Sequence, residues 1–231
     1  MAKIEWDKTG EHKYETGVDH AVLYIRDESG AYANGYAWNG VTSISESPSG
    51  AESSAQYADN MKYLNLVSAE EFGATIEAFT YPDEFAQCNG EVEVVPGVNI
   101  GQQKRSTFGL SYRTKTGDDV NGQDKFYKLH LVYGCTASPS ERAYATINES
   151  PEAMSFSWEL NTNPEPVKGH DDMKPTSLIT IDSREVDKTK LTKIEEVLYG
   201  TEEVEPRLPL PDEIITMLSD ATDVSELPVA D

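Results

Sequence analysis

The sequence predicts a mainly β fold: an antiparallel β-sandwich or barrel with a flanking α-helix, a long loop and extended terminal arms. Apolar side chains recur at every second position in several separate runs, which is the period of a half-buried strand. Segments rich in Gly, Asn, Asp and Pro divide these runs, as turns divide the strands of antiparallel sheets. Near the C-terminal end the apolar spacing becomes helical, which predicts the flanking helix.

The first quarter of the chain predicts two strands and a loop. Residues 20–27, HAVLYIRD, are typical of a short strand, and Asn34-Gly35 is a turn signal that leads to a second strand over residues 38–45. The segment 45–60 is rich in Ser, Pro and Gly and is too long for a tight hairpin turn. Loops of this length in a compact domain are usually functional or mobile.

A third strand is predicted within residues 72–81, followed by a short helix. Apolar and polar side chains alternate along this run, and one face is formed by Phe72, Ala74, Ile76 and Ala78. Pro82 suits the first turn of a helix of about two turns, and acidic residues directly after it favour the positive end of the helix dipole.

Four further alternating runs predict the rest of the sheet, and a polar segment over residues 115–124 predicts a hairpin between the first two. Each run places its apolar side chains on one side. These runs are 106–114 with Phe108, Leu110 and Tyr112; 125–133 with Tyr127, Leu129, Leu131 and Tyr133; 154–160 with Met154, Phe156, Trp158 and Leu160; and the shorter 177–183.

The C-terminal part predicts a half-buried helix that ends at Gly200, because Leu191, Ile194 and Leu198 share one helical face. A short helix can follow Pro211. With no internal repeat and no second core evident, we expect one domain. Its divisions are an N-terminal arm over residues 1–19, a β-domain over 20–200 and an acidic C-terminal arm over 201–231.

The strongest compositional signal is negative charge. The 231 residues include 41 Asp and Glu but only 19 Lys and Arg, for a formal net charge of −22. Proteins bind nucleic acid through Lys and Arg that neutralise phosphates, so this chain is expected to repel DNA and anionic membranes on average. The acidity indicates either solubility or a surface that faces a polyanion without binding it. No signal peptide or membrane-spanning run is evident.

The sequence contains only weak signals for a catalytic site or a metal site. The stretch 68–90 contains five carboxylates and no Lys or Arg, but acidic neighbours are expected by chance in so acidic a chain, so we predict no catalytic dyad. His12, His20, His130 and His170 are scattered, and the segment GHDDMK around Asp171 and Asp172 lacks the spacing of a calcium loop. We therefore expect no enzyme activity, metal or cofactor. Cys88 and Cys135 fit free structural thiols in a reducing cytoplasm.

Aromatic side chains divide into two groups. Trp38, Tyr81, Tyr112 and Trp158 are expected in the core, where aromatic residues on alternating strands usually lie. Tyr57 and Tyr63, at the end of the long loop, have nothing in the sequence that obviously covers them. Exposed aromatic side chains on a loop suit contact with a protein partner.

Several blocks in order resemble the major tail (tail tube) proteins of bacteriophages and prophages of Gram-positive bacteria. The resemblance extends from about Gly35 to Leu218, and the order and length of the blocks carry it rather than any chemical motif. The blocks are YADNMKYLNLVSAEEFGATIEAFTYPDEFAQCNG, PGVNIGQQKRSTFGLSYRT, YKLHLVYGC, INESPEAMSFSWEL and EVLYGTEEVEPRLPLPDEI.

The resemblance implies a structural virion protein without catalytic residues. Such proteins form hexameric rings whose inner sheets join into one β-barrel, and the rings stack through a long loop and the terminal arms. The tube assembles in the host cytoplasm around a tape-measure protein, meets tail terminator and baseplate or distal tail proteins, and conducts DNA into the host. For this chain the resemblance implies inter-subunit contacts through the loop residues Pro48, Tyr57, Asp59 and Tyr63.

The charge then predicts an acidic lumen that DNA passes without adhering, with Glu77 and Glu159 as candidate lumen acids. Three alternatives stay open. The chain can form the tube of a contractile tail or of a phage-derived bacteriocin, it can be a carbohydrate-binding β-sandwich with an exposed aromatic platform, or it can be a hydrolase that uses Glu70 and Asp83.

Overall fold

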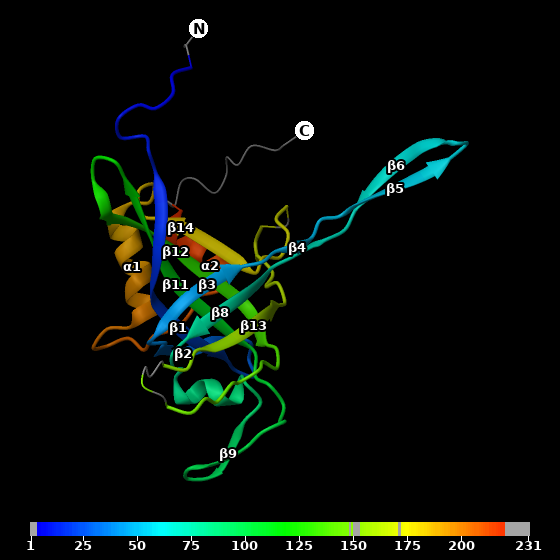
Figure 1. The fold of residues 1–231 in the computed structure, drawn as a ribbon. Helices are drawn as coiled ribbons and strands as arrows, with labels where there is room; N and C mark the ends of the chain where they lie inside the picture. Colours follow the sequence, from blue (N-terminus) through cyan, green and yellow to red (C-terminus); the bar gives the residue numbers. More distant parts are fainter. Residues whose placement is uncertain (1–3, 148, 150–152, 171, 220–231) are drawn as a thin grey trace.

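The computed structural model describes residues 4–147, 149, 153–170 and 172–219, and its centre is one curled antiparallel sheet (Figure 1). Within these residues the sheet has eight strands in the order β2-β1-β11-β12-β13-β8-β3, and β14 pairs with β12 off this path. The strands are β1 (Tyr14–Arg26), β2 (Tyr32–Ala37), β3 (Val41–Glu46), β8 (Gly73–Ala78), β11 (Phe108–Asp118), β12 (Gly122–Ala137), β13 (Phe156–Thr162) and β14 (Leu178–Asp182). The mainly β, antiparallel class is thus confirmed.

Two apolar clusters lie on the two faces of this sheet. The first, inside the curl, contains the predicted apolar faces of β8 and β11 together with Trp38, Phe85 and Trp158. The second contains Leu129, Leu131 and Tyr133 of β12 and lies between the sheet and the helices α1 (Lys188–Tyr199) and α2 (Pro211–Leu218). The prediction of a single core was wrong because successive residues of β11 and β12 point to opposite faces and both faces are covered.

Strand β12 joins the two halves of the sheet at Gly134. One edge of β12 pairs with β11, while the other pairs first with β14 and then, after Gly134, with β13. Gly134 has a φ of 64°, and a Cβ added there would lie 2.0 Å from the Asn163 carbonyl oxygen. The Gly134 N–H donates to the Tyr32 hydroxyl at 2.9 Å, and the Asn163 N–H donates to the Gly134 carbonyl at 3.0 Å. Only glycine fits this close approach.

The helices pack on the second cluster. Asp187 caps α1 by accepting hydrogen bonds from the backbone N–H groups of Thr189 and Lys190, and the predicted face Leu191, Ile194 and Leu198 is buried. The predicted helix after Pro211 forms as α2. Leu208 and Ile214 are also buried, so the predicted acidic arm packs on the body as far as α2. Residues 220–231 of that predicted arm lie outside the described residues.

Two local predictions near the N-terminus differ from the structure. Asn34-Gly35 is a bulge within β2 and not a turn: Tyr24 pairs with Gly35 and Ile25 with Ala33, which leaves Asn34 unpaired at a φ of 56°. Strand β1 begins at Tyr14, inside the predicted N-terminal arm, because residues 14–19 pair with β11. The turn between β1 and β2 is instead formed at Asp27, whose carboxylate accepts from the Ser29 and Ala31 N–H groups.

Two further segments differ in their secondary structure. The second strand, β3, spans Val41–Glu46 rather than residues 38–45. After Pro82 the chain forms a 3₁₀ helix, η1 (Asp83–Gln87), that is shorter than the two turns predicted and buries Phe85. Short 3₁₀ helices are common connectors, and this one places the Phe85 side chain in the first cluster.

The predicted loop over residues 45–60 is the first half of a β-hairpin that projects from the body (Figure 1). We call residues 49–71 the arm. Its base is β4 (Ser49–Gly50) paired with β7 (Glu70–Glu71), and its outer part is β5 (Ser53–Ala58) paired with β6 (Met61–Val67). The turn uses Asp59 and Asn60, both at positive φ, as a two-residue hairpin turn requires. Sequence reasoning missed it because the small polar residues of β5 alternate weakly.

Candidate functional site

The outward face of β3, β8 and β13 is polar, acidic and free of basic residues. Glu77 lies opposite Ser157 of β13 and Ser43 of β3, and Glu159 lies opposite Thr75. The alternate residues of β8 and β13, among them Ile76 and Trp158, point into the first cluster. We call this surface the acidic sheet face; its members are Ser43, Ser45, Thr75, Glu77, Ser157, Glu159 and Asn161.

Both predicted lumen acids belong to the acidic sheet face. Glu77 and Glu159 are exposed, and the Ser43 hydroxyl donates to the Glu77 carboxylate at 2.9 Å. Strands β3, β8 and β13 contain no Lys or Arg, so no fixed positive charge lies within the face itself. A polyanion that approached this surface would meet carboxylates and small hydroxyl groups, which hold water and offer no ion pair.

The outer part of the arm, residues 53–67, is an exposed hairpin with apolar side chains and little charge, while Glu52, Glu70 and Glu71 lie near its base. Tyr57 and Tyr63 have relative exposures of 73% and 71%, and Met61, Leu66 and Val67 are exposed as well. Residues 53–67 contain one acid and one base, Asp59 and Lys62. Because each outer arm strand pairs only with the other in the described structure, both outer edges present unpaired backbone groups. Open edges of this kind favour pairing with another chain.

The structure places the four predicted inter-subunit residues at the base, on the outer strands and in the turn of the arm. Pro48 lies at its base between β3 and β4, Tyr57 and Tyr63 lie on its two outer strands, and Asp59 lies in its turn. All four are exposed. The arm continues from β3, which carries Ser43 and Ser45, and from β8, which carries Glu77, so the acidic sheet face and the arm form one connected feature.

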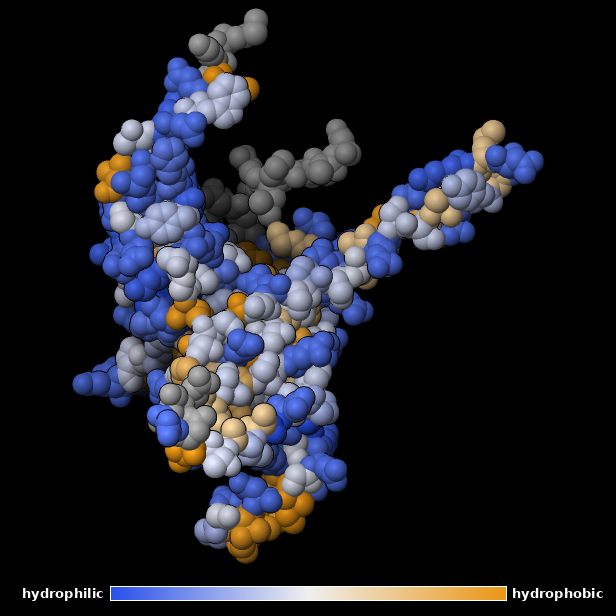
Figure 2. Space-filling view, viewed as in Figure 1, coloured by the Kyte–Doolittle hydropathy of each residue, from blue (hydrophilic) through white to orange (hydrophobic). Residues whose placement is uncertain are grey.

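A second apolar projection was missed by sequence reasoning. The hairpin of β9 (Val92–Val95) and β10 (Val98–Ile100) extends from the opposite end of the body and appears as a group of hydrophobic residues at the bottom of Figure 2. Its valines and isoleucine are about half exposed. The signal was present in the sequence as VEVVPGVNI, where a Pro-Gly turn separates two aliphatic runs.

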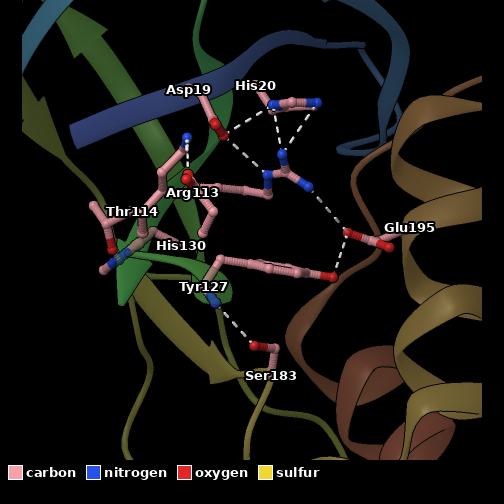
Figure 3. Close-up of polar contacts among 10 residues, drawn as sticks. Asp19, His20, Arg113, Thr114, Tyr127, His130, Ser183 and Glu195 are labelled. Atoms are coloured by element: carbon pink, nitrogen blue, oxygen red, sulfur yellow. Dashed lines mark hydrogen bonds and ion pairs between the residues drawn. The ribbon is translucent and has the colours of Figure 1, made fainter. Parts of the chain in front are cut away.

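A polar cluster between β1, β11, β12 and α1 holds the sheet to the helix (Figure 3). The Arg113 guanidinium donates to Asp19 at 3.0 Å, stacks 4.7 Å from the centre of the Tyr127 ring and lies 3.7 Å from Glu195. Tyr127 donates its hydroxyl proton to Glu195 at 2.8 Å. Burial opposes ionisation of Asp19, but hydrogen bonds from Arg113 and His20 outweigh it and lower the pKa of that carboxyl. These contacts join β1, β11 and β12 to α1.

His130 is enclosed at one end of the first cluster. Its ring stacks on Tyr112 with centroids 4.7 Å apart, and its nitrogens lie 3.7 Å from Glu15 and 3.4 Å from Glu46. Burial lowers the pKa of His130, since desolvation outweighs the attraction of the two carboxylates, and nearby Lys128 lowers it further. The neutral imidazole is therefore the form that the folded protein favours.

The free energy of unfolding should consequently fall as the pH drops below about 6.5, the pKa of histidine in an unfolded chain. Below that pH the unfolded state takes up a proton that His130 resists in the folded state. Urea unfolding at pH 7.5 and 5.5 should show a smaller loss for His130→Gln than for the native protein. His170→Gln, in the loop before β14, is the matched control and should keep the native loss. Equal losses in all three proteins would contradict this role for His130.

The residues considered for catalysis or metal binding do not converge in the described structure. Glu70 and Glu71 lie at the base of the arm, Glu77 on β8 and Asp83 in η1. Among the described residues, no group of three or more His, Cys, Asp or Glu side chains could hold a metal ion. Asp171 lies outside the described residues.

The thiols and three of the four predicted core aromatics lie where the sequence predicted, whereas Tyr81 is only partly buried against the first cluster. Cys88 and Cys135 are free and buried, and burial raises the pKa of the Cys88 thiol to about 12. Trp38, Tyr112 and Trp158 are buried in the first cluster. Within the described chain, neither α1 nor α2 has the length and apolar character needed to cross a bilayer.

Comparison with known proteins adds no family assignment. No protein-family model matches the chain, and no curated protein matches it. The functional argument therefore depends on the surfaces described above: the acidic sheet face, the arm that continues from it, and the apolar hairpin at the opposite end of the body.

Proposed function

We propose that this protein is the subunit of a bacteriophage tail tube, in which copies join into hexameric rings, the rings stack, and the acidic sheet face lines the channel for DNA. The observation that carries this proposal is the continuity of β3 and β8 from the acidic sheet face into the arm. One pair of strands thus carries a surface without basic residues and, beyond it, an exposed apolar hairpin suited to a neighbouring subunit.

The two edge strands of the main sheet differ. The edge at β2 is covered by the chain that follows, whereas the edge at β3 is open to a neighbouring copy. At the β2 end, the Gly35 N–H donates to the Pro206 carbonyl at 2.9 Å and the Leu208 N–H donates to the Tyr32 carbonyl at 3.0 Å, so the following chain covers that edge. At the other end, β3 pairs with β8 alone in the described structure. An open edge of this kind favours pairing with a strand of a neighbouring copy.

Charge provides the reason that such a channel conducts DNA. Duplex DNA carries one negative charge per about 1.7 Å of its axis, so Lys and Arg along a lumen would bind it and slow its passage. Glu77 and Glu159 repel the phosphates, and the Ser, Thr and Asn side chains around them keep the surface hydrated. With a net charge of −22 on every copy, the contacts between copies must offset their mutual repulsion.

The same proposal assigns the remaining partners. A tape-measure protein would occupy the lumen during assembly, and tail terminator and distal tail or baseplate proteins would contact the two ends of the tube. The protein would assemble in the bacterial cytoplasm and reside in the virion tail, with no catalytic residue and no cofactor.

Charge reversal on the acidic sheet face tests the channel. Particles whose tubes carry Glu77→Lys or Glu159→Lys should assemble but release DNA several-fold more slowly, because each ring then presents six cations to the phosphates. DNA release can be followed with an intercalating dye after receptor triggering. Glu203→Lys, an exposed residue in the turn before α2, makes the same charge change away from this face and should release DNA at the native rate. Equal rates in all variants would refute the proposed lining.

A further inference from the structure

The β9–β10 hairpin exposes an apolar surface that the body does not cover. Val92, Val94, Val95, Val98 and Ile100 have relative exposures between 44% and 54%, and they extend over both strands of the hairpin. In the described structure these two strands pair only with each other. Contiguous exposed apolar side chains on a projection of this kind mark an interaction site.

Charge indicates what covers this surface. Residues 92–100 contain a single charged side chain, Glu93, and residues 53–67 of the arm contain one acid and one base. Two copies that carry −22 each repel one another over most of their surfaces. Along their outer strands the two apolar hairpins carry little charge, so two copies can approach there with little repulsion and bury apolar side chains.

Their placement favours contact between different hairpins of two copies. The arm and the β9–β10 hairpin project from opposite ends of the body (Figure 1). When copies associate head to tail, the arm of one copy meets the β9–β10 hairpin of the next. Such a heterologous contact repeats along a row of copies and covers both hairpins in every copy except those at the ends.

We propose that the β9–β10 hairpin of one copy docks along the outer part of the arm, β5 and β6, of a second copy of this chain. The inference rests on the proposed tube, and it assigns the element of the next ring that receives the arm. Valine and isoleucine side chains of one hairpin pack against Leu64 and Leu66 of the other, which share one face of β6.

One oppositely charged pair fits this arrangement at the turn of the arm, whereas the acids Glu70 and Glu71 lie at the other end of the overlap, at the base of the arm. Two hairpins that project toward each other overlap side by side, so the turn of each lies near the base of the other. Asp59 in the turn of the arm then lies toward exposed Lys104, four residues after the end of β10. The turn at Gly97 lies toward the base of the arm, which places Val98 near Leu66.

A cysteine pair tests this contact. Val98→Cys is introduced in one preparation and Leu66→Cys in a second, tagged preparation, and the two are mixed under assembly conditions with a short bis-maleimide. The native thiols of Cys88 and Cys135 are fully buried, so they do not compete for the reagent. We expect a cross-linked species that contains one tagged and one untagged copy. Val120→Cys, at least as exposed as Val98 and located in the turn between β11 and β12, is the matched control and should give none with Leu66→Cys.

The outcomes separate this contact from the tube. Tubes with no more cross-linking through Val98→Cys than through Val120→Cys would overturn the contact and leave the tail-tube proposal standing. Cross-linked pairs in a protein that never forms tubes would support the contact and overturn the tube. Failure of both the tubes and the cross-link would overturn both proposals.

Discussion

Deletion of the arm is expected to abolish tube formation and to leave the body folded. Removal of residues 51–69 and insertion of Asn-Gly between Gly50 and Glu70 would close the base of the arm with a two-residue hairpin turn, because Gly50 and Glu70 are paired in the structure. No residue of the deleted segment belongs to either apolar cluster. The free energy of unfolding should therefore change by less than about 1 kcal/mol.

Assembly should be lost because the deletion removes the apolar side chains and open strand edges that offset repulsion between copies. Sedimentation at increasing protein concentration measures it, and the shortened protein should remain monomeric where the native protein forms large species. A protein that keeps the arm but carries Asn60→Gly is the control, since Asp-Gly preserves both the hairpin turn and Asp59, and it should assemble. Native-like tubes from the shortened protein would refute the proposed role of the arm.

Substitution of Gly134 by alanine should be the most damaging single change to the body. The new Cβ would lie 2.0 Å from the Asn163 carbonyl oxygen, and the backbone would have to hold alanine at a φ of 64°. Relief of the clash would separate β12 from β13, and with it the first cluster from the rest of the sheet. We expect a loss of about 3 kcal/mol or more in the free energy of unfolding, measured by urea denaturation.

Gly122 provides the matched control for this substitution. It also has a positive φ, 73°, but a Cβ added there meets no atom within 4 Å. Gly122→Ala should therefore cost only the strain of the left-handed conformation, about 1–2 kcal/mol. If the two variants lost the same stability, the close approach between β12 and Asn163 would not determine how the sheet divides.

The parts of the fold that were predictable are those with a strong apolar period. The run that contains Phe108, Leu110 and Tyr112, and the run that contains Leu129, Leu131 and Tyr133, each predicted a strand correctly. The helical spacing of Leu191, Ile194 and Leu198 predicted α1 for the same reason. In each case one side of the element is buried. Its apolar residues therefore recur at the period of a strand or a helix and can be recognised in the sequence.

The parts that were not predictable depend on contacts between distant segments. The arm buries neither face, so β5 and β6 have no apolar alternation to reveal them. Alternation predicted the apolar sides of β11 and β12 but not that they face different clusters, which requires knowledge of what covers each side. Asn163 approaches Gly134, 29 residues earlier in the chain, only because β12 changes its partner from β14 to β13 at this point.

The candidate surfaces also contain one part that the sequence predicted and one part that depends on contacts between distant segments. Acids at outward positions of two strands were readable, and Glu77 and Glu159 were identified from them. That β13 lies beside β8, so that both acids share one face, was not readable because 77 residues separate β8 from β13. The hairpin at Val92–Ile100 was readable but was not recognised, since it contains no residue type that suggests chemistry.

Negative-stain electron microscopy of the purified native protein, at high concentration and over a series of salt concentrations, tests the tail-tube proposal most directly. We expect rings and stacked tubes of uniform diameter with a central channel. They should become more abundant as salt rises, because screening shortens the range of repulsion between copies that each carry −22. Dispersed monomers at every salt concentration would contradict the proposal.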